Sequence, residues 1–219
     1  LGSHMVKKKS VVVRLHSREL FFFFFHITWN NIDRIVLVSK AMEKKFVSQF
    51  PSTAGKIHVI PSGKSMAKFK MQHHTFRGNL AMLCELVPIK RVYEMILTLH
   101  QLKQKGCSLN LHIAGKSMEG VNNQRYLISM QRAVDKLSLT DQVTFHGWID
   151  DVASWLNQMD IFISNSFWEA QQNALIEAMA AGCFCLSHFW DGAEEILPKE
   201  YIYSTDEELQ QLIFTYCAI

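Results

Sequence analysis

The sequence predicts an α/β protein built on a doubly wound, Rossmann-like parallel sheet. Three observations favour this fold. Short apolar runs alternate with amphipathic segments, several runs are apolar at every residue, and proline or glycine marks several of the helix ends. Strands that are apolar throughout are typical of parallel sheets covered by helices on both faces, and right-handed crossovers then give a doubly wound order.

The expected elements follow from hydrophobic periodicity and from start and stop signals. Pro88 suits the first position of a helix, and Gly106 and Gly182 suit the position just after a helix. We expect strands at residues 11–15, 35–38, 58–60, 80–84, 109–114, 143–145, 161–163, 184–187 and 201–203. We expect helices around residues 41–47, at 88–105, 122–137, 151–157, 170–181 and 192–197, and from residue 206.

The composition excludes several classes of protein. The 219 residues are 48% hydrophobic and 20% charged with a net charge of +3, which is ordinary for a globular protein and does not indicate a nucleic-acid-binding surface. The five cysteines form no CxxC pair and no histidine cluster has zinc spacing, so no zinc site is indicated and we expect buried thiols in a reducing compartment. We also expect a cytoplasmic protein with no metal and no cofactor.

Two N-terminal segments stand apart from the fold. Residues 1–5 resemble the remnant of a cleaved expression tag. Residues 21–25 are five consecutive phenylalanines, far fewer than the roughly 20 apolar residues that span a bilayer. The run is expected to be a core or interface segment, with contact to a membrane surface or a role in oligomerisation as alternatives.

Ligands of such sheets bind beyond the carboxyl ends of the strands. Those ends are expected at Cys84–Glu85, Gly115–Lys116, Gly147–Trp148 and residues 164–169. Four loops therefore face one crevice. Trp148 could stack on a base there or simply pack.

Glu169 and Glu177 flank the start of the helix expected at 170–181. A helix beginning near Glu169 would separate them by about 12 Å along its axis, which is too far to share a proton but suits two contacts on a long ligand. The alternative is that Glu169 only complements the helix dipole and that Glu177 lies on a solvated face.

Lys90 and Arg91 are expected in the first turn of the helix at 88–105. The dipole disfavours cations there unless an anion is bound between them, although both side chains could reach solvent. Two Gly-Lys-Ser tripeptides, at Gly63 and Gly115, lack the glycine that a phosphate-binding P-loop has five residues earlier, and no GxGxxG motif occurs.

These residues resemble the donor-binding half of the retaining GT-B glycosyltransferases of group 1. The family pattern of a Glu, seven residues and then Glu-Ala-Met-Ala-x-Gly matches Glu169 and residues 177–182. Residues 59–63, 86–90 and 192–196 resemble further family segments in the same order, so the likeness extends over about residues 33–198.

The resemblance implies that Glu169 contacts the transferred sugar, that Lys90 contacts the diphosphate and that Glu177 contacts the ribose hydroxyls. Of these three residues, Glu169 and Lys90 are the expected catalytic residues. The donor would be a UDP-sugar or a GDP-sugar, with no metal required. The remaining residues expected to bind the donor are Arg91, Gly115, Trp148, Ile149, Gln171, Gln172 and Asn173.

The resemblance also implies a domain division. Residues 6–55 would be the remnant of an acceptor-binding domain with its linker helix, and residues 56–219 the nucleotide-sugar-binding domain. The chain alone is then expected to bind a donor without transferring it efficiently. The resemblance implies a glycan or lipid-linked acceptor and a role in polysaccharide biosynthesis. It also implies that the missing domain is a partner of this chain and that the full-length protein could associate peripherally with the inner membrane face.

Three departures from the family keep other functions open. Glu85 replaces a phosphate-binding arginine, residues 170–172 replace a Gly-x-Gly segment, and the Gly115 loop lacks a second glycine. They motivate the alternative of a catalytically inactive nucleotide-sugar-binding or scaffolding domain. A GT-B epimerase or phosphorylase is a third possibility.

Overall fold

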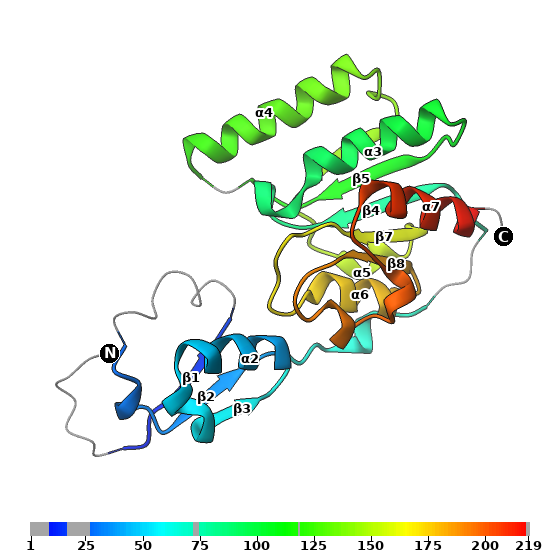
Figure 1. Cartoon of the computed structure of the whole chain (residues 1–219). Coiled ribbons are helices and arrows are strands. Elements are labelled where there is room, and N and C mark those ends of the chain that lie inside the picture. Colours follow the sequence, from blue (N-terminus) through cyan, green and yellow to red (C-terminus); the bar gives the residue numbers. More distant parts are fainter. Residues whose placement is uncertain (1–8, 17–26, 72–74, 118, 218–219) are drawn as a thin grey trace. The chain divides into compact units, whose positions relative to one another are not determined.

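The computed structural model describes residues 9–16, 27–71, 75–117 and 119–217, which form two compact units (Figure 1). The first unit comprises the chain up to Gly63 together with Glu169–Gln171, and the second comprises Lys64–Trp168 and the chain from Gln172 onward. The expected tag remnant at 1–5 and the phenylalanine run at 21–25 lie outside the described residues.

The first unit contains a parallel three-stranded sheet in the order β1-β2-β3. One helix, α2, begins after Ser39, whose hydroxyl accepts a hydrogen bond from the amide of Met42. The core of this unit includes Trp29 and Phe46, whose ring centroids lie 4.9 Å apart. The elements are β1 Val12–Leu15, η2 Trp29–Asn31, β2 Arg34–Leu37, α2 Lys40–Gln49, η3 Pro51–Lys56 and β3 Ile57–Val59.

The boundary between the units differs from the expected division at 55/56. Strand β3 pairs with β2, Ile35 opposite Ile57, so residues 57–59 belong to the sheet of the first unit. The compact units accordingly divide after Gly63. Strand pairing depends on a partner distant in sequence, which the local sequence pattern does not reveal.

The second unit is an α/β domain with a six-stranded parallel sheet in the order β6-β5-β4-β7-β8-β9, which confirms the expected doubly wound fold. Numbered from β4, this is the 3-2-1-4-5-6 order of Rossmann sheets, with its reversal between β4 and β7. The strands are β4 Asn79–Leu83, β5 Asn110–Ala114, β6 Val143–Gly147, β7 Ile161–Ser164, β8 Phe184–His188 and β9 Ile202–Tyr203.

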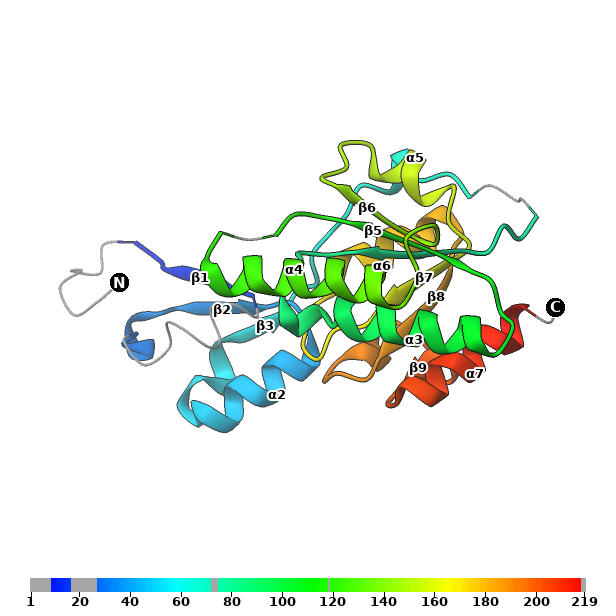
Figure 2. The same ribbon diagram turned by 90° about the horizontal axis from the view of Figure 1, so that it is seen from above.

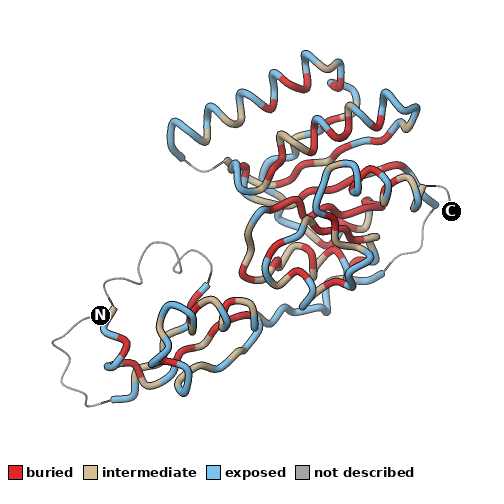
Figure 3. Tube along the Cα trace, viewed as in Figure 1, coloured by how far each residue is buried: buried red, intermediate tan, exposed pale blue. Residues whose placement is uncertain are grey.

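Helices cover both faces of this sheet (Figure 2). On one face α3, α4 and α7 enclose an aliphatic core, and on the other face α5 and α6 pack against Phe162 and Ala81. The buried residues are concentrated along the central strands (Figure 3). The helices are α3 Val92–Gln104, α4 Val121–Lys136, α5 Val152–Leu156, α6 Asn173–Ala181 and α7 Asp206–Cys217, with 3-10 turns η4 Met66–Lys68, η5 Pro88–Lys90, η6 Ala193–Glu195 and η7 Lys199–Tyr201.

The helix expected at 88–105 begins later than expected. Pro88 opens the 3-10 turn η5, Arg91 takes a left-handed conformation with φ 52°, and α3 starts at Val92. Lys90 and Arg91 are therefore not in the first turn of an α-helix, so the dipole argument for an anion between them was wrong. The helix expected at 192–197 is likewise only the 3-10 turn η6.

Buried polar contacts stabilise the unusual backbone of Arg91. Its guanidinium donates to Asp206 at 2.9 Å and to the side-chain oxygen of Asn165 at 3.2 Å, and the side-chain nitrogen of Asn165 donates back to the Arg91 carbonyl at 2.9 Å. The Tyr203 hydroxyl donates to the same Asn165 oxygen at 2.8 Å. This network joins the start of α3, the end of β7, β9 and the first turn of α7.

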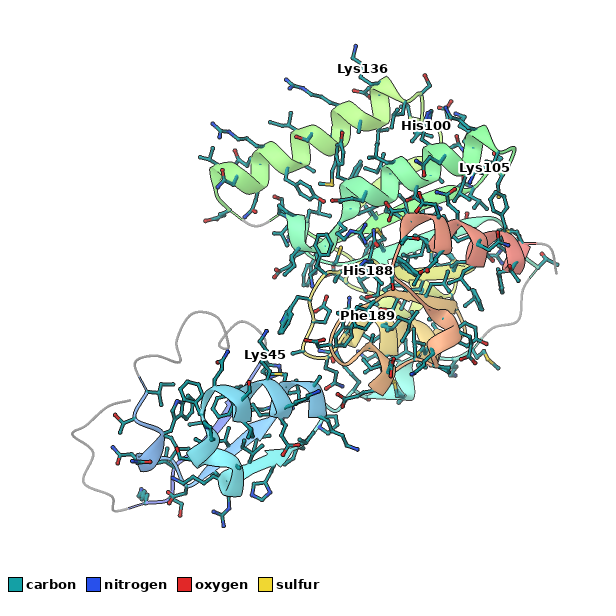
Figure 4. The ribbon with its side chains drawn as sticks, in the orientation of Figure 1. Lys45, His100, Lys105, Lys136, His188 and Phe189 are labelled. Carbon is teal, nitrogen blue, oxygen red and sulfur yellow. The ribbon has the colours of Figure 1, made fainter. Side chains whose placement is uncertain are left out.

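A second contact ties the middle of α7 to the end of α3. Lys105, which follows α3, donates from Nζ to the side-chain oxygen of Gln210 at 2.6 Å (Figure 4). The Gln210 side-chain amide in turn donates to Gln101 on α3 at 2.6 Å.

Among the described residues, no helix is both long and apolar enough to cross a membrane.

A pair of histidines joins β5 to the edge strand β6. His112 Nδ1 lies 3.0 Å from His146 Nε2, so one ring must donate and the other accept. Burial lowers the pKa of His112, assisted by the charge of His146, and burial also lowers the pKa of His146. The folded state therefore favours uncharged rings.

We expect Asp206→Asn to lower the free energy of unfolding by about 1 to 2 kcal/mol, because it removes the charge that pairs with the buried Arg91 guanidinium. Glu207→Gln, an exposed acid in the same turn, is the matched control. Urea denaturation of both variants measures the difference. Equal stability of the two variants would contradict this account of the network.

We also expect the protein to lose stability as the pH falls below about 6.5, the ordinary histidine pKa, because the unfolded chain then binds protons that the folded His112–His146 pair resists. Urea unfolding at pH 7.5, 6.5 and 5.5 measures the loss. His146→Phe keeps a ring beside Trp155 and should reduce the pH dependence. An unchanged slope in this variant would refute the assignment to the pair.

Candidate functional site

Lys90 lies at the reversal of strand order in the second unit. It follows β4, and the loop after the neighbouring strand β7 bonds to the residues on both sides of it. The amide of Phe167 donates to the Ile89 carbonyl at 3.0 Å, and Asn165 donates to the Arg91 carbonyl. The expected phosphate-contacting lysine is therefore held at the carboxyl edge, where ligands of such sheets bind.

Arg91 was expected to bind the donor, and the structure gives it a different role. The residue is only 7% exposed, its guanidinium bonds to Asp206 and Asn165, and it lies 4.8 Å from the centroid of the Phe167 ring. These contacts commit the guanidinium to holding loops together. Contact of Arg91 with a donor remains a prediction.

Gly115 brings the ends of three strands together. Its φ is 132°, and a Cβ at this position would lie 1.8 Å from the carbonyl oxygen of Cys84, so only glycine fits. The Gly115 amide donates to the Gly147 carbonyl at 2.7 Å, and the Leu86 amide donates to the Lys116 carbonyl at 3.0 Å. The loops after β4, β5 and β6 thus form one connected rim.

Trp148 presents a largely exposed ring on this rim. The side chain is 64% exposed, its indole N–H donates to Asp150 at 2.9 Å, and Lys116 Nζ lies 5.1 Å from the ring centroid. An exposed indole can stack on a planar base. Ile149, the next predicted contact, is half-buried and packs against the core beneath α5 and α6.

No side chain of the N-cap residue caps the first turn of α6. The Gln172 residue at its N-cap makes no side-chain bond to the turn, because its amide instead donates to the Ser164 hydroxyl at 3.2 Å. Ser39 and Asp151, by contrast, cap α2 and α5. Within the described residues, the buried side-chain oxygen of Asn173 has no hydrogen-bond partner. Amide donors and this acceptor together suit an oxygen-rich ligand that also carries hydroxyls.

Glu177 lies one turn into α6, about 6 Å along the axis from Asn173. Its Oε1 accepts a hydrogen bond from Lys64 Nζ at 2.6 Å, and its side chain is 14% exposed. The predicted ribose-contacting carboxylate is therefore partly buried and paired with a cation. Nothing in the local sequence around Lys64, whose Gly-Lys-Ser tripeptide lacks the P-loop glycine, indicates this pairing.

Glu169 and Gln171 do not lie in α6, which contradicts the expected helix start and its spacing of about 12 Å. Both belong to the first unit. Ala170 is buried in the core of that unit, and the Gln171 side chain accepts from the Ser62 amide at 2.6 Å and donates to the Ser62 carbonyl at 3.1 Å. These contacts draw the segment away from the helix.

The structure thus places Lys90, Gly115, Trp148, Ile149, Gln172, Asn173 and Glu177 in the second unit. Lys64, Asn165 and Asp206 are functional neighbours that the sequence did not identify. Nothing in local periodicity indicates them, because each acts on a residue between 74 and 115 positions away. The described residues contain no cluster of three or more histidine, cysteine or acidic side chains able to hold a metal ion.

Solved structures are similar in fold over most of the chain. HepE from Anabaena, in complex with UDP and glucose, matches with a TM-score of 0.80 and 19% identity over 94% of this chain and 61% of its own. A mutant of S. aureus TarM, in a complex that includes UDP, matches with a TM-score of 0.76 and 16% identity over 94% of this chain and 43% of its own.

Sucrose-phosphate synthase from Thermosynechococcus elongatus also matches, with a TM-score of 0.73 and 19% identity over 86% of this chain and 50% of its own. The chain therefore spans between 43% and 61% of the length of these three proteins. A search of curated proteins by sequence found no match.

The family model described as Glycosyl transferases group 1 matches residues 77–213, which is more than half of the chain and nearly the whole second unit. The match agrees with the sheet order and with the resemblance seen in the motifs. The chain belongs to the group 1 glycosyltransferase family and has the Rossmann-like fold of GT-B enzymes.

Proposed function

We propose that the second unit binds a nucleotide-diphosphate sugar at the reversal between β4 and β7, as part of an enzyme that transfers the sugar with retention. The observation that carries the proposal is the placement of Lys90 and the uncapped start of α6 on adjacent strand ends of one parallel sheet. A cation and free helix amides at one edge form an anion site. The UDP bound by HepE supports a nucleotide as the ligand.

Each part of the donor has a chemically matched group. The diphosphate would meet the Lys90 ammonium and the first amides of α6, and the ribose hydroxyls would donate to Glu177. The sugar hydroxyls would donate to Asn173, whose buried oxygen otherwise lacks a partner in the described residues. The base would stack on Trp148, which is exposed on the rim beside Gly115 and Ile149.

Catalysis would be electrostatic. As the bond from the sugar to the diphosphate breaks, negative charge grows on the leaving oxygen, and Lys90 with the helix amides would stabilise it more strongly than they stabilise the intact donor. Contact between Glu169 and the transferred sugar stays a prediction of the family resemblance. The acceptor, expected to be a glycan or a lipid-linked glycan in polysaccharide synthesis, would bind to other parts of the enzyme.

A second candidate is a nucleotide-sugar-binding or scaffolding domain without catalysis. Two observations favour it. Glu85 is an exposed negative charge on the rim, where it repels a diphosphate, and the buried Gln172 side chain fills space beside Ser164 that the family leaves to glycine. This candidate predicts donor binding without turnover.

We expect isothermal calorimetry to detect binding of UDP or GDP to the chain, and Glu177→Gln to weaken that binding about tenfold, because a charged hydrogen-bond acceptor for the ribose is lost. Glu200→Gln, an exposed acid in η7, is the matched control and should bind like the wild type. Absence of heat with both nucleotides would rule out the proposed donor site.

For transfer, we expect the enzyme that carries this chain to convert an α-linked UDP-sugar or GDP-sugar into an α-linked product, since the mechanism proposed is retaining. The proton coupling constant at the anomeric carbon, measured by NMR, distinguishes the products. A β-linked product would contradict retention. Donor binding without any product from a panel of glycan acceptors would favour the scaffolding alternative.

A further inference from the structure

Lys64 forms the one ion pair that engages the expected ribose-binding carboxylate in the described structure. Its Nζ lies 2.6 Å from Glu177 Oε1, and the two side chains are 33% and 14% exposed. The lysine stands at the beginning of the second unit, 113 residues before its partner. A short, charge-assisted hydrogen bond of this kind is strong and occupies one of the two carboxylate oxygens.

The Lys64 ammonium and the ribose of a bound donor would therefore compete for the Glu177 carboxylate. The vicinal hydroxyls of a ribose donate two hydrogen bonds, and a carboxylate receives both most fully when its two oxygens are available. In the structure Oε1 already accepts from Lys64. A nucleotide that engages both oxygens of Glu177 must displace the ammonium or accept a poorer contact.

We propose that Lys64 is an internal counter-ion that competes with the donor ribose for Glu177 and so sets how strongly the protein distinguishes ribose from deoxyribose. This inference rests on the proposed function, in which Glu177 receives the ribose. Lys64 would then be a specificity-determining residue, one that acts through Glu177 rather than on the reacting atoms.

The surroundings of Lys64 suit a contact that can be exchanged. The Lys64 side chain is one-third exposed, and exposed ion pairs contribute little net stability because water and salt replace them readily. At the preceding residue, Gly63, an added Cβ would have no atom within 4 Å, so the chain is not tightly packed on that side. The lysine stem adds four rotatable carbons of reach.

The test compares dissociation constants for UDP and 2′-deoxy-UDP, or for GDP and 2′-deoxy-GDP if guanine is preferred, by calorimetry on the whole chain. The dissociation constant of the deoxynucleotide divided by that of the ribonucleotide isolates the ribose contact, because each pair of ligands has the same base and the same phosphate charge. A larger ratio means a stronger preference for ribose. We expect Lys64→Met to raise this ratio about fivefold over the wild type. Lys64→Arg should keep it close to the wild-type value, because the cation remains.

Lys70→Met is the matched control, since it removes an exposed lysine from the same segment without touching Glu177, and its ratio should not change. A ratio for Lys64→Met that equals or falls below the wild-type ratio would overturn the inference while leaving nucleotide binding intact. If neither the wild type nor any variant binds a nucleotide, the proposed function fails and the inference falls with it.

Discussion

The site depends on one adjacency, that of β4 and β7 at the reversal of strand order. Because all strands of the sheet are parallel, both end at the same edge, and their loops leave toward helices on opposite faces. The Lys90 loop and the start of α6 come from these two strands. A pairing slip by one residue would turn the alternating side chains of β7 to the wrong faces, so the core that fixes the register also fixes the site.

Around this edge, the residues that tie the loops together differ from those proposed to bind a ligand. Arg91 has the charge of a ligand-binding residue, yet its buried bonds to Asn165 and Asp206 tie loops together and leave the neighbouring Lys90 as the half-buried cation. Gly115 likewise closes the rim through backbone contacts that only a glycine permits. Among the described residues, the groups that could meet a ligand besides Lys90 and Glu177 include amides at an uncapped helix, the buried side-chain oxygen of Asn173 and the Trp148 ring.

The sequence predicted the second unit well because its signals are local. Apolar runs marked the strands, and Gly106 and Gly182 marked the ends of α3 and α6, where both take a left-handed conformation with φ of 85° and 90°. Pro88 did not mark the start of α3, because it opens the 3-10 turn η5 instead. The predictions that were wrong depend on distant partners. The helix expected from residue 170 starts at Asn173, because Ala170 and Gln171 are held by the core and by Ser62 of the first unit. No helix propensity reveals such a competition, and the pairing of Lys64 with Glu177 is equally invisible to periodicity.

The central claim is that a nucleotide diphosphate lies at the edge between β4 and α6. The most direct measurement is a titration of the isotope-labelled chain with UDP and with GDP, followed by amide NMR. The account predicts that the largest shift changes fall on the first-turn amides of α6, from Asn173 to Ile176, and on Lys90. Shift changes confined to the opposite edge of the sheet, where β4 and β7 begin, would contradict it.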